Sequence, residues 1–242
     1  MPPTSAKPVT TPIPVQLSAT EFTAFLLPHL SMPQRGPKCT LGYYRVFNLI
    51  LWVLYTGMQW KCLPVPTDTH GKSAIHYTTA YKVFAKWSDD GSLEEAFIAS
   101  VQHLADHNQL DLSVLHGDGT NTVAKKGGDG IGYSGHKHQK GDKVIAIIDN
   151  NGYVLAPLPV APVNTAETVL LPTGLNTLKR VATRTGFELH GASRNLDGGC
   201  DSRANRQAIF HAGLMPNSTE NPRNRKTTTR GRKRLFNHAI HA

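Results

Sequence analysis

Two aspartates stand where a strand is expected to end, and such positions can hold a metal ion. Asp118 follows the apolar run 113–115 within Gly117-Asp118-Gly119, and Asp197 follows an expected strand over 187–196. Ligands gather at strand ends in α/β sheets. Two carboxylates that meet there are best accommodated around a cation, for which Mg²⁺ is suited. Asp-Gly pairs are also common in turns, so the residues alone leave a plain turn open.

Two other motifs are weaker candidates for chemistry. Gly130, Gly132 and Gly135 match the spacing of a dinucleotide-binding loop, but no helical pattern follows them. His136 and His138 could share a strand face and bind zinc. However, no Cys/His pair at zinc-finger spacing accompanies them, and neighbouring lysines disfavour a cation.

Three further residues have simpler interpretations than catalysis. Asp149 is explained by a hairpin turn, and Asp201 precedes Ser202 at an expected helix start, where an acid is an ordinary cap. Cys200 has no readable catalytic partners around it, and a lone cysteine is more often structural.

The positive charge of the chain is concentrated in one segment. The sequence has 26 Lys+Arg against 17 Asp+Glu, a formal charge of +9. Seven of the basic residues and no acid lie within 223–234, so the rest of the chain is nearly neutral. This segment indicates an anionic polymer as partner, with a solvated basic tail as the alternative.

Length and composition describe a globular protein. The 242 residues are 39% apolar and 18% charged, enough to bury a core. Three distant cysteines favour a reduced, cytosolic setting over a disulfide framework. The longest apolar stretch, 46–55, is too short to span a membrane, and the N-terminus does not resemble a signal peptide.

Three helices are expected before residue 110. The patterns cover 41–56, ending at Gly57, then 74–87, and then a helix from Ser92 to about 107 with Ser92 and Glu95 as a capping box. Such short helices suit a helix-turn-helix-like module. The aromatic stripe of the second helix is interpreted as core.

The pattern changes to mixed α/β after residue 110. A short strand at 113–115 is followed by a glycine-rich loop, then by a hairpin of 143–148 and 153–160. A helix over 165–182, broken near 172–174, precedes the strand 187–196 and a helix over 202–212. We therefore expect a flexible leader (1–20), a helical module (21–110) and an α/β domain (111–242).

Several long motifs together resemble one family. They are HGDGTN at 116–121, AKKGGDGIGYSGHKHQ at 124–139, APVN at 161–164, NLDGGCDS at 195–202 and NPRNRK at 221–226. In this order they are similar to bacterial insertion-sequence transposases of the IS-five type. The segment 54–64 is similar to that family's N-terminal DNA-binding helices, and the resemblance covers the chain from about residue 40.

The resemblance implies an RNase H-like mixed sheet flanked by helices and an Asp-Asp-Glu triad holding two Mg²⁺ ions, or Mn²⁺. Asp118 matches the first acid and Asp197 the second, as catalytic and metal-binding residues. The implied reaction is hydrolysis of a phosphodiester at the element's end, followed by strand transfer. The residues expected to contact double-stranded DNA are Lys125, Lys126, His136, Lys137, His138, Lys140, Arg223, Arg225, Lys226, Arg230, Arg232, Lys233 and Arg234.

The third acid of the triad has no match in this sequence. The family places a Glu on a helix that would follow residue 242, so we expect a truncated chain with weak activity. Glu167 and Glu188 precede Asp197, which is the wrong order, and Glu220 precedes Asn-Pro. A non-catalytic DNA-binding protein that inhibits an intact transposase is the alternative, whereas the motif order argues against an unrelated metal-dependent nuclease. The expected location is the bacterial cytoplasm, at the nucleoid; the sequence leaves a homodimer open.

Overall fold

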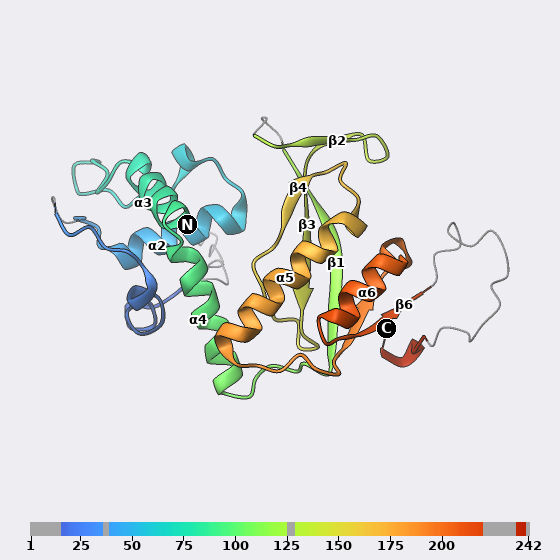
Figure 1. Ribbon diagram of the computed structural model, residues 1–242. Helices are drawn as coiled ribbons and strands as arrows, with labels where there is room; N and C mark the ends of the chain where they lie inside the picture. Colours follow the sequence, from blue (N-terminus) through green and yellow to red (C-terminus); the bar gives the residue numbers. More distant parts are fainter. Residues whose placement is uncertain (1–15, 36–38, 125–128, 220–235, 241–242) are drawn as a thin grey trace, which may run out of the picture. The chain divides into compact units, whose positions relative to one another are not determined.

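The computed structural model describes residues 16–35, 39–124, 129–219 and 236–240 (Figure 1). The chain divides into two compact units, Met1–Ala99 and Ser100–Ala242. Within the described residues, no helix combines the length and apolar character needed to cross a membrane.

The first unit is helical. It contains α1 (Ala19–Glu21), a π-helical turn (Phe22–Leu26), two short 3-10 helices (Leu27–His29 and Trp60–Cys62), α2 (Tyr43–Thr56), α3 (Tyr77–Asp89) and the start of α4 (Ser92–Asp106). The end of α2 is confirmed: Gly57 adopts φ 67°, a left-handed conformation that glycine reaches without strain.

The core of the first unit forms around α2 and α3. Trp87 is buried and donates its indole N–H to the Ser31 carbonyl at 2.9 Å. Its ring lies 6.2 Å from that of Phe47, and Val46 and Ile50 are buried beside them. The interpretation of the aromatic stripe as core is therefore confirmed for Trp87 and in part for Phe84, which packs against the same cluster, whereas Tyr81 is 49% exposed and is not a core residue.

The predicted cap of α4 is wrong in detail. Ser92 lies inside the helix, because the Glu95 N–H donates to the Gly91 carbonyl. The Asp90 carboxylate accepts both the Ser92 N–H (3.0 Å) and the Ser92 hydroxyl (2.5 Å). Asp90, two residues earlier, therefore accepts a backbone N–H at the start of α4, the role that the sequence assigned to Ser92.

The second unit is built on a mixed sheet. Its strands are β1 (Val114–Val123), β2 (Gly132–Ser134), β3 (Gln139–Ile148), β4 (Val160–Pro162), β5 (Ser193–Leu196) and β6 (Met215–Ser218). The order is β2-β3-β1-β5-β6, with β4 also paired to β3. β3 is antiparallel to β1, β2 and β4, whereas β5 is parallel to β1 and to β6. The predicted mixed sheet flanked by helices is confirmed.

Two strands differ from their predicted lengths. β1 continues through the glycines that were expected to end it, because it pairs with β3 over the whole register from His116↔Ile148 to Val123↔Gly141. Asp118 therefore lies inside a strand and not after one. The strand predicted over 187–196 is confined to β5.

The predicted hairpin keeps its turn but loses most of its second strand. The buried Asp149 carboxylate accepts the N–H groups of Asn151 (3.1 Å) and Tyr153 (2.7 Å), which confirms its role in the turn. Beyond it, the pairing with β3 is reduced to the bridge Ile148↔Val154, β4 and two separate backbone hydrogen bonds, from the Leu155 N–H to the Ile147 carbonyl and from the Ile145 N–H to the Pro159 carbonyl. Pro157 and Pro159 interrupt the pairing because proline has no N–H to donate.

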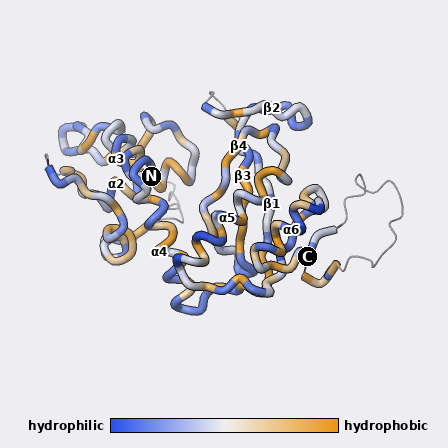
Figure 2. Tube along the Cα trace, in the orientation of Figure 1, coloured by the Kyte–Doolittle hydropathy of each residue, from blue (hydrophilic) through white to orange (hydrophobic). Residues whose placement is uncertain are grey.

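Two helices flank the sheet. α5 (Glu167–Thr185) is continuous through Pro172, so the predicted break is wrong; the buried α5 residues pack on the apolar sheet and outweigh one missing hydrogen bond. α6 (Arg203–His211) begins where the sequence predicted, directly after Ser202, which is its N-cap. Figure 1 shows α5 and α6 side by side in front of the sheet, and Figure 2 shows hydrophobic residues where α5 meets β3. Two 3-10 turns, Gly198–Cys200 and His238–Ile240, complete the unit.

Candidate active site

The two aspartates singled out in the sequence line the same hollow. β1 and β5 are adjacent parallel strands in which Gly117 lies opposite Leu196, so the next residues along, Asp118 and Asp197, lie side by side. They border a hollow of about 440 Å³. Its lining is His116, Gly117, Asp118, Ala146, Ile148, Asn195, Leu196 and Asp197.

Both carboxylates are exposed and partly fixed by their own backbone. One oxygen of Asp118 accepts the N–H of Gly119 at 2.7 Å, and one oxygen of Asp197 accepts the N–H of Gly198 at 2.6 Å. The second oxygen of each can serve as a ligand. A pair of carboxylates fits Mg²⁺, which takes one or two of them together with water and substrate phosphate. The described residues contain no cluster of three metal-ligating side chains.

Sequence reasoning missed two residues that line the hollow. His116 and Asn195 each lie two positions before an aspartate, and side chains two apart on a strand share a face. The ring of His116 lies 3.4 Å from Asn150 Oδ1, and the buried Asn195 accepts the Asn217 side-chain N–H at 2.7 Å. The period of two along each strand could have identified both.

Glycine is required on both sides of Asp118 because other side chains approach β1 closely from the face opposite the Asp118 carboxylate. A Cβ on Gly117 would lie 1.8 Å from Nη2 of Arg194, and one on Gly119 would lie 2.6 Å from the carboxylate of Glu167. Neighbouring strand positions face opposite sides, so both groups lie behind the Asp118 carboxylate. The turn interpretation of this Asp-Gly pair is wrong.

Glu167 belongs to a polar cluster on that opposite face. Its carboxylate pairs with Lys143 Nζ at 3.4 Å and accepts the Cys200 thiol at 3.6 Å. Burial, reinforced by the nearby Glu167 charge, raises the pKa of the Cys200 thiol to about 12. The thiol is therefore protonated at neutral pH and is no nucleophile, in agreement with a structural role.

Arg194 is a fully buried cation behind the same strand. Its side chain has a relative exposure of 0%, and none of its guanidinium nitrogens has a hydrogen-bond partner among the described residues. Burial lowers the pKa of Arg194 from its ordinary value to about 10, which still leaves it charged at neutral pH. Nothing in the composition or periodicity of the sequence signals this arrangement.

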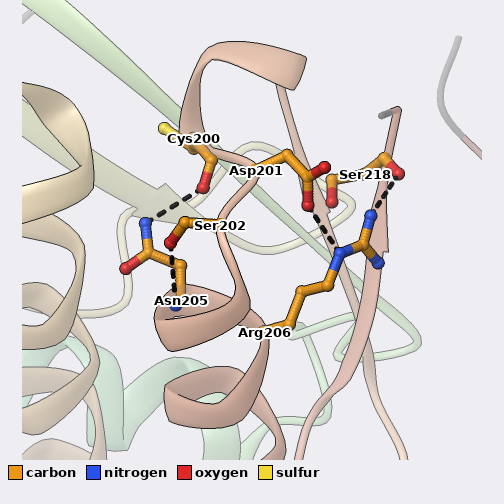
Figure 3. A network of polar contacts seen from close by, with 6 residues as sticks. All are labelled: Cys200, Asp201, Ser202, Asn205, Arg206 and Ser218. Carbon is orange, nitrogen blue, oxygen red and sulfur yellow. Dashed lines mark hydrogen bonds and ion pairs between the residues drawn. The ribbon is translucent and has the colours of Figure 1, made fainter. Parts of the chain in front are cut away.

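The segment after Asp197 is held by a separate polar network (Figure 3). Arg206 pairs with Asp201 at 2.5 Å and donates to the Ser218 carbonyl at 3.1 Å. The cap of α6 is Ser202, whose hydroxyl accepts the Asn205 N–H at 3.1 Å. The expectation that Asp201 acts as a helix cap is thus wrong, and its carboxylate is used in an ion pair.

The residues expected to contact DNA are only partly described. His136, Lys137 and His138 lie in the exposed turn between β2 and β3, and Lys140 lies in β3. The structure thus brings these four together on one hairpin, and none of them lines the hollow that Asp118 and Asp197 border. The others lie outside the described residues: Lys125, Lys126, Arg223, Arg225, Lys226, Arg230, Arg232, Lys233 and Arg234.

Comparison with known proteins gives structural matches only. No protein-family model and no curated protein matches the chain. It is similar to the catalytic domain of Mos1 transposase solved with raltegravir and Mn, at 13% identity and a TM-score of 0.32, covering 50% of this chain and 56% of that one. It is also similar to piggyBac transposase in a synaptic complex with hairpin DNA, at 12% identity and a TM-score of 0.45, covering 84% of this chain and 48% of that one. The chain thus spans little more than half the length of the Mos1 domain it matches.

Proposed function

We propose that the chain is a DNA transposase of a bacterial insertion sequence, of the IS-five type. The observation that carries this proposal is that Asp118 in β1 and Asp197, which directly follows the parallel neighbour β5, line one hollow. The sequence motifs that resemble the family independently selected these two residues as the first two acids of its triad. Motif order and sheet topology therefore support the same pair.

In this proposal the two aspartates hold a divalent cation, Mg²⁺ or Mn²⁺. When bound, the ion polarises a phosphodiester and stabilises the attacking and leaving oxygens. The backbone N–H groups of Gly119 and Gly198 hold one oxygen of each carboxylate, so the ligands are oriented before the cation binds. Lys137 and Lys140 would contact phosphates of double-stranded DNA, which makes binding sensitive to salt.

A non-catalytic DNA-binding protein is the second candidate. Among the described residues, two carboxylates line the hollow, whereas the family's triad has three acids. This difference favours the non-catalytic candidate. Such a chain could bind the element ends at the nucleoid, as a monomer or homodimer, and inhibit an intact copy. The two candidates differ only in strand cleavage.

A cleavage assay separates the two candidates. The full chain is incubated with Mg²⁺ and DNA fragments taken from both flanks of its own coding sequence, and nicking and binding are measured on the same samples. We expect salt-sensitive binding with weak cleavage, whereas binding with no cleavage at all would favour the non-catalytic candidate. Cleavage that disappears in Asp118→Asn would eliminate the binding-only candidate. Absence of DNA binding at low salt would eliminate both.

A further inference from the structure

The hairpin between β2 and β3 presents an aromatic side chain among cations. Tyr133 is 53% exposed and lies directly opposite Lys140 in the antiparallel register. Its hydroxyl lies 3.4 Å from Nδ1 of His138, which adopts a left-handed backbone conformation (φ 49°) at the turn. His136 and Lys137 are exposed in the same turn. An exposed tyrosine thus lies opposite one lysine and on the same hairpin as a second.

The base of this hairpin is packed tightly against the sheet. A Cβ on Gly132 would lie 2.0 Å from Oδ1 of Asn164, and one on Gly141 would lie 1.8 Å from the Thr122 carbonyl. The turn is closed by the Lys137 N–H, which donates to the Ser134 hydroxyl at 3.2 Å. The strand that carries Tyr133 is therefore fixed, so little side-chain and backbone freedom would be lost on binding a ligand.

The chemistry of this surface matches a nucleotide whose base is unpaired. Residues directly opposite on antiparallel strands share a face of the sheet, so a base stacked on Tyr133 would have its phosphate beside Lys140. Proteins that bind single strands combine such aromatic faces with cations that follow the backbone. A fully paired duplex hides its base faces within the stack, and an apolar partner would gain nothing from the surrounding lysines and histidines.

We propose that Tyr133 stacks on the base of an unpaired DNA nucleotide, while Lys137 and Lys140 contact the adjoining phosphates. The inference rests on the proposed function to the extent that it requires the chain to bind DNA. It adds a base-contacting residue to a hairpin otherwise expected only to contact phosphates. Unpaired nucleotides of this kind arise at cleaved or frayed DNA ends.

The test uses the full chain and a single-stranded oligonucleotide with one 2-aminopurine, compared with its fully paired duplex. Stacking on an aromatic ring quenches the fluorescence of 2-aminopurine. We expect Tyr133→Ala to abolish the quench and to weaken single-strand binding about tenfold, whereas Tyr133→Phe retains both. Tyr153→Ala is the matched control, because that tyrosine is 42% exposed in the same unit.

The salt dependence distinguishes stacking from charge. Tyr133→Ala should leave the slope of log Kd against log salt unchanged, while Lys137→Ala should reduce it by about one. If Tyr133→Ala binds single strands as wild type does, with the quench intact, the inference is overturned while the proposed function stands. If wild type binds neither oligonucleotide at low salt, the proposed function fails, and the inference fails with it.

Discussion

The buried guanidinium of Arg194 makes a quantitative prediction about stability. Burial lowers its pKa from the ordinary value to about 10, and at 1.36 kcal/mol per pKa unit the charged form costs about 3 kcal/mol in the folded state. Arg194→Met removes that charge and keeps an unbranched side chain of similar reach. Allowing for the volume of guanidinium that methionine leaves unfilled, we expect the free energy of unfolding to rise by about 2 kcal/mol.

Urea denaturation at constant pH measures this change. With an unfolding slope of about 2 kcal/mol/M, the midpoint should move up by about 1 M while the slope stays the same. Arg206→Met is the matched control, because Arg206 pairs with the buried Asp201 at 2.5 Å. Loss of that ion pair should lower the free energy of unfolding by about 2 kcal/mol.

The pH dependence has a defined sign. Because the folded pKa of Arg194 is depressed to about 10, the unfolded chain binds more protons than the folded one above pH 10, so the wild type gains stability as the pH rises above 10. The advantage of Arg194→Met should therefore be constant from pH 6 to 9 and shrink above pH 10. A variant that is less stable than wild type at pH 7 would refute the reasoning, since it would mean that the guanidinium is well paired in the folded protein.

Further predictions concern glycines and thiols. Gly117→Ala should lower the free energy of unfolding by about 2 kcal/mol or more in urea titrations, because the new methyl group meets Arg194; in Arg194→Met the same substitution should cost less. Gly57→Ala, at φ 67°, should cost about 1 kcal/mol, and no change would argue against the left-handed end of α2. In the native protein, Cys200 should resist a thiol reagent at pH 8 while the exposed Cys62 reacts; rapid modification of Cys200 would contradict a thiol pKa of about 12.

Local signals in the sequence predicted the elements that local chemistry decides. Gly57 ends α2, and α6 begins at the predicted position after Ser202, because the signals that end and start a helix act within one turn of it. The motifs that resemble the family also selected Asp118 and Asp197 together, although Asp118 lies within β1 and not at its end as predicted.

Features that depend on packing between distant segments were not predictable. Pro172 stays inside α5 because the apolar face of that helix is buried, and β1 continues past Gly117 because β3 supplies its hydrogen bonds. In the sequence, Glu167 was rejected as the third acid only because it precedes Asp197 along the chain. Its position behind Gly119 follows from how α5 packs on the sheet, and no local pattern encodes that contact.

Binding of Mn²⁺ to the full chain, followed by electron paramagnetic resonance, tests most directly whether Asp118 and Asp197 form one cation site. We predict that Asp118→Asn and Asp197→Asn each weaken Mn²⁺ binding at least about tenfold, and that the double variant is little worse than either single one. Asp106→Asn, which alters an exposed carboxylate on α4, should bind as wild type does. Equal Mn²⁺ affinity in wild type and in both site variants would contradict the account.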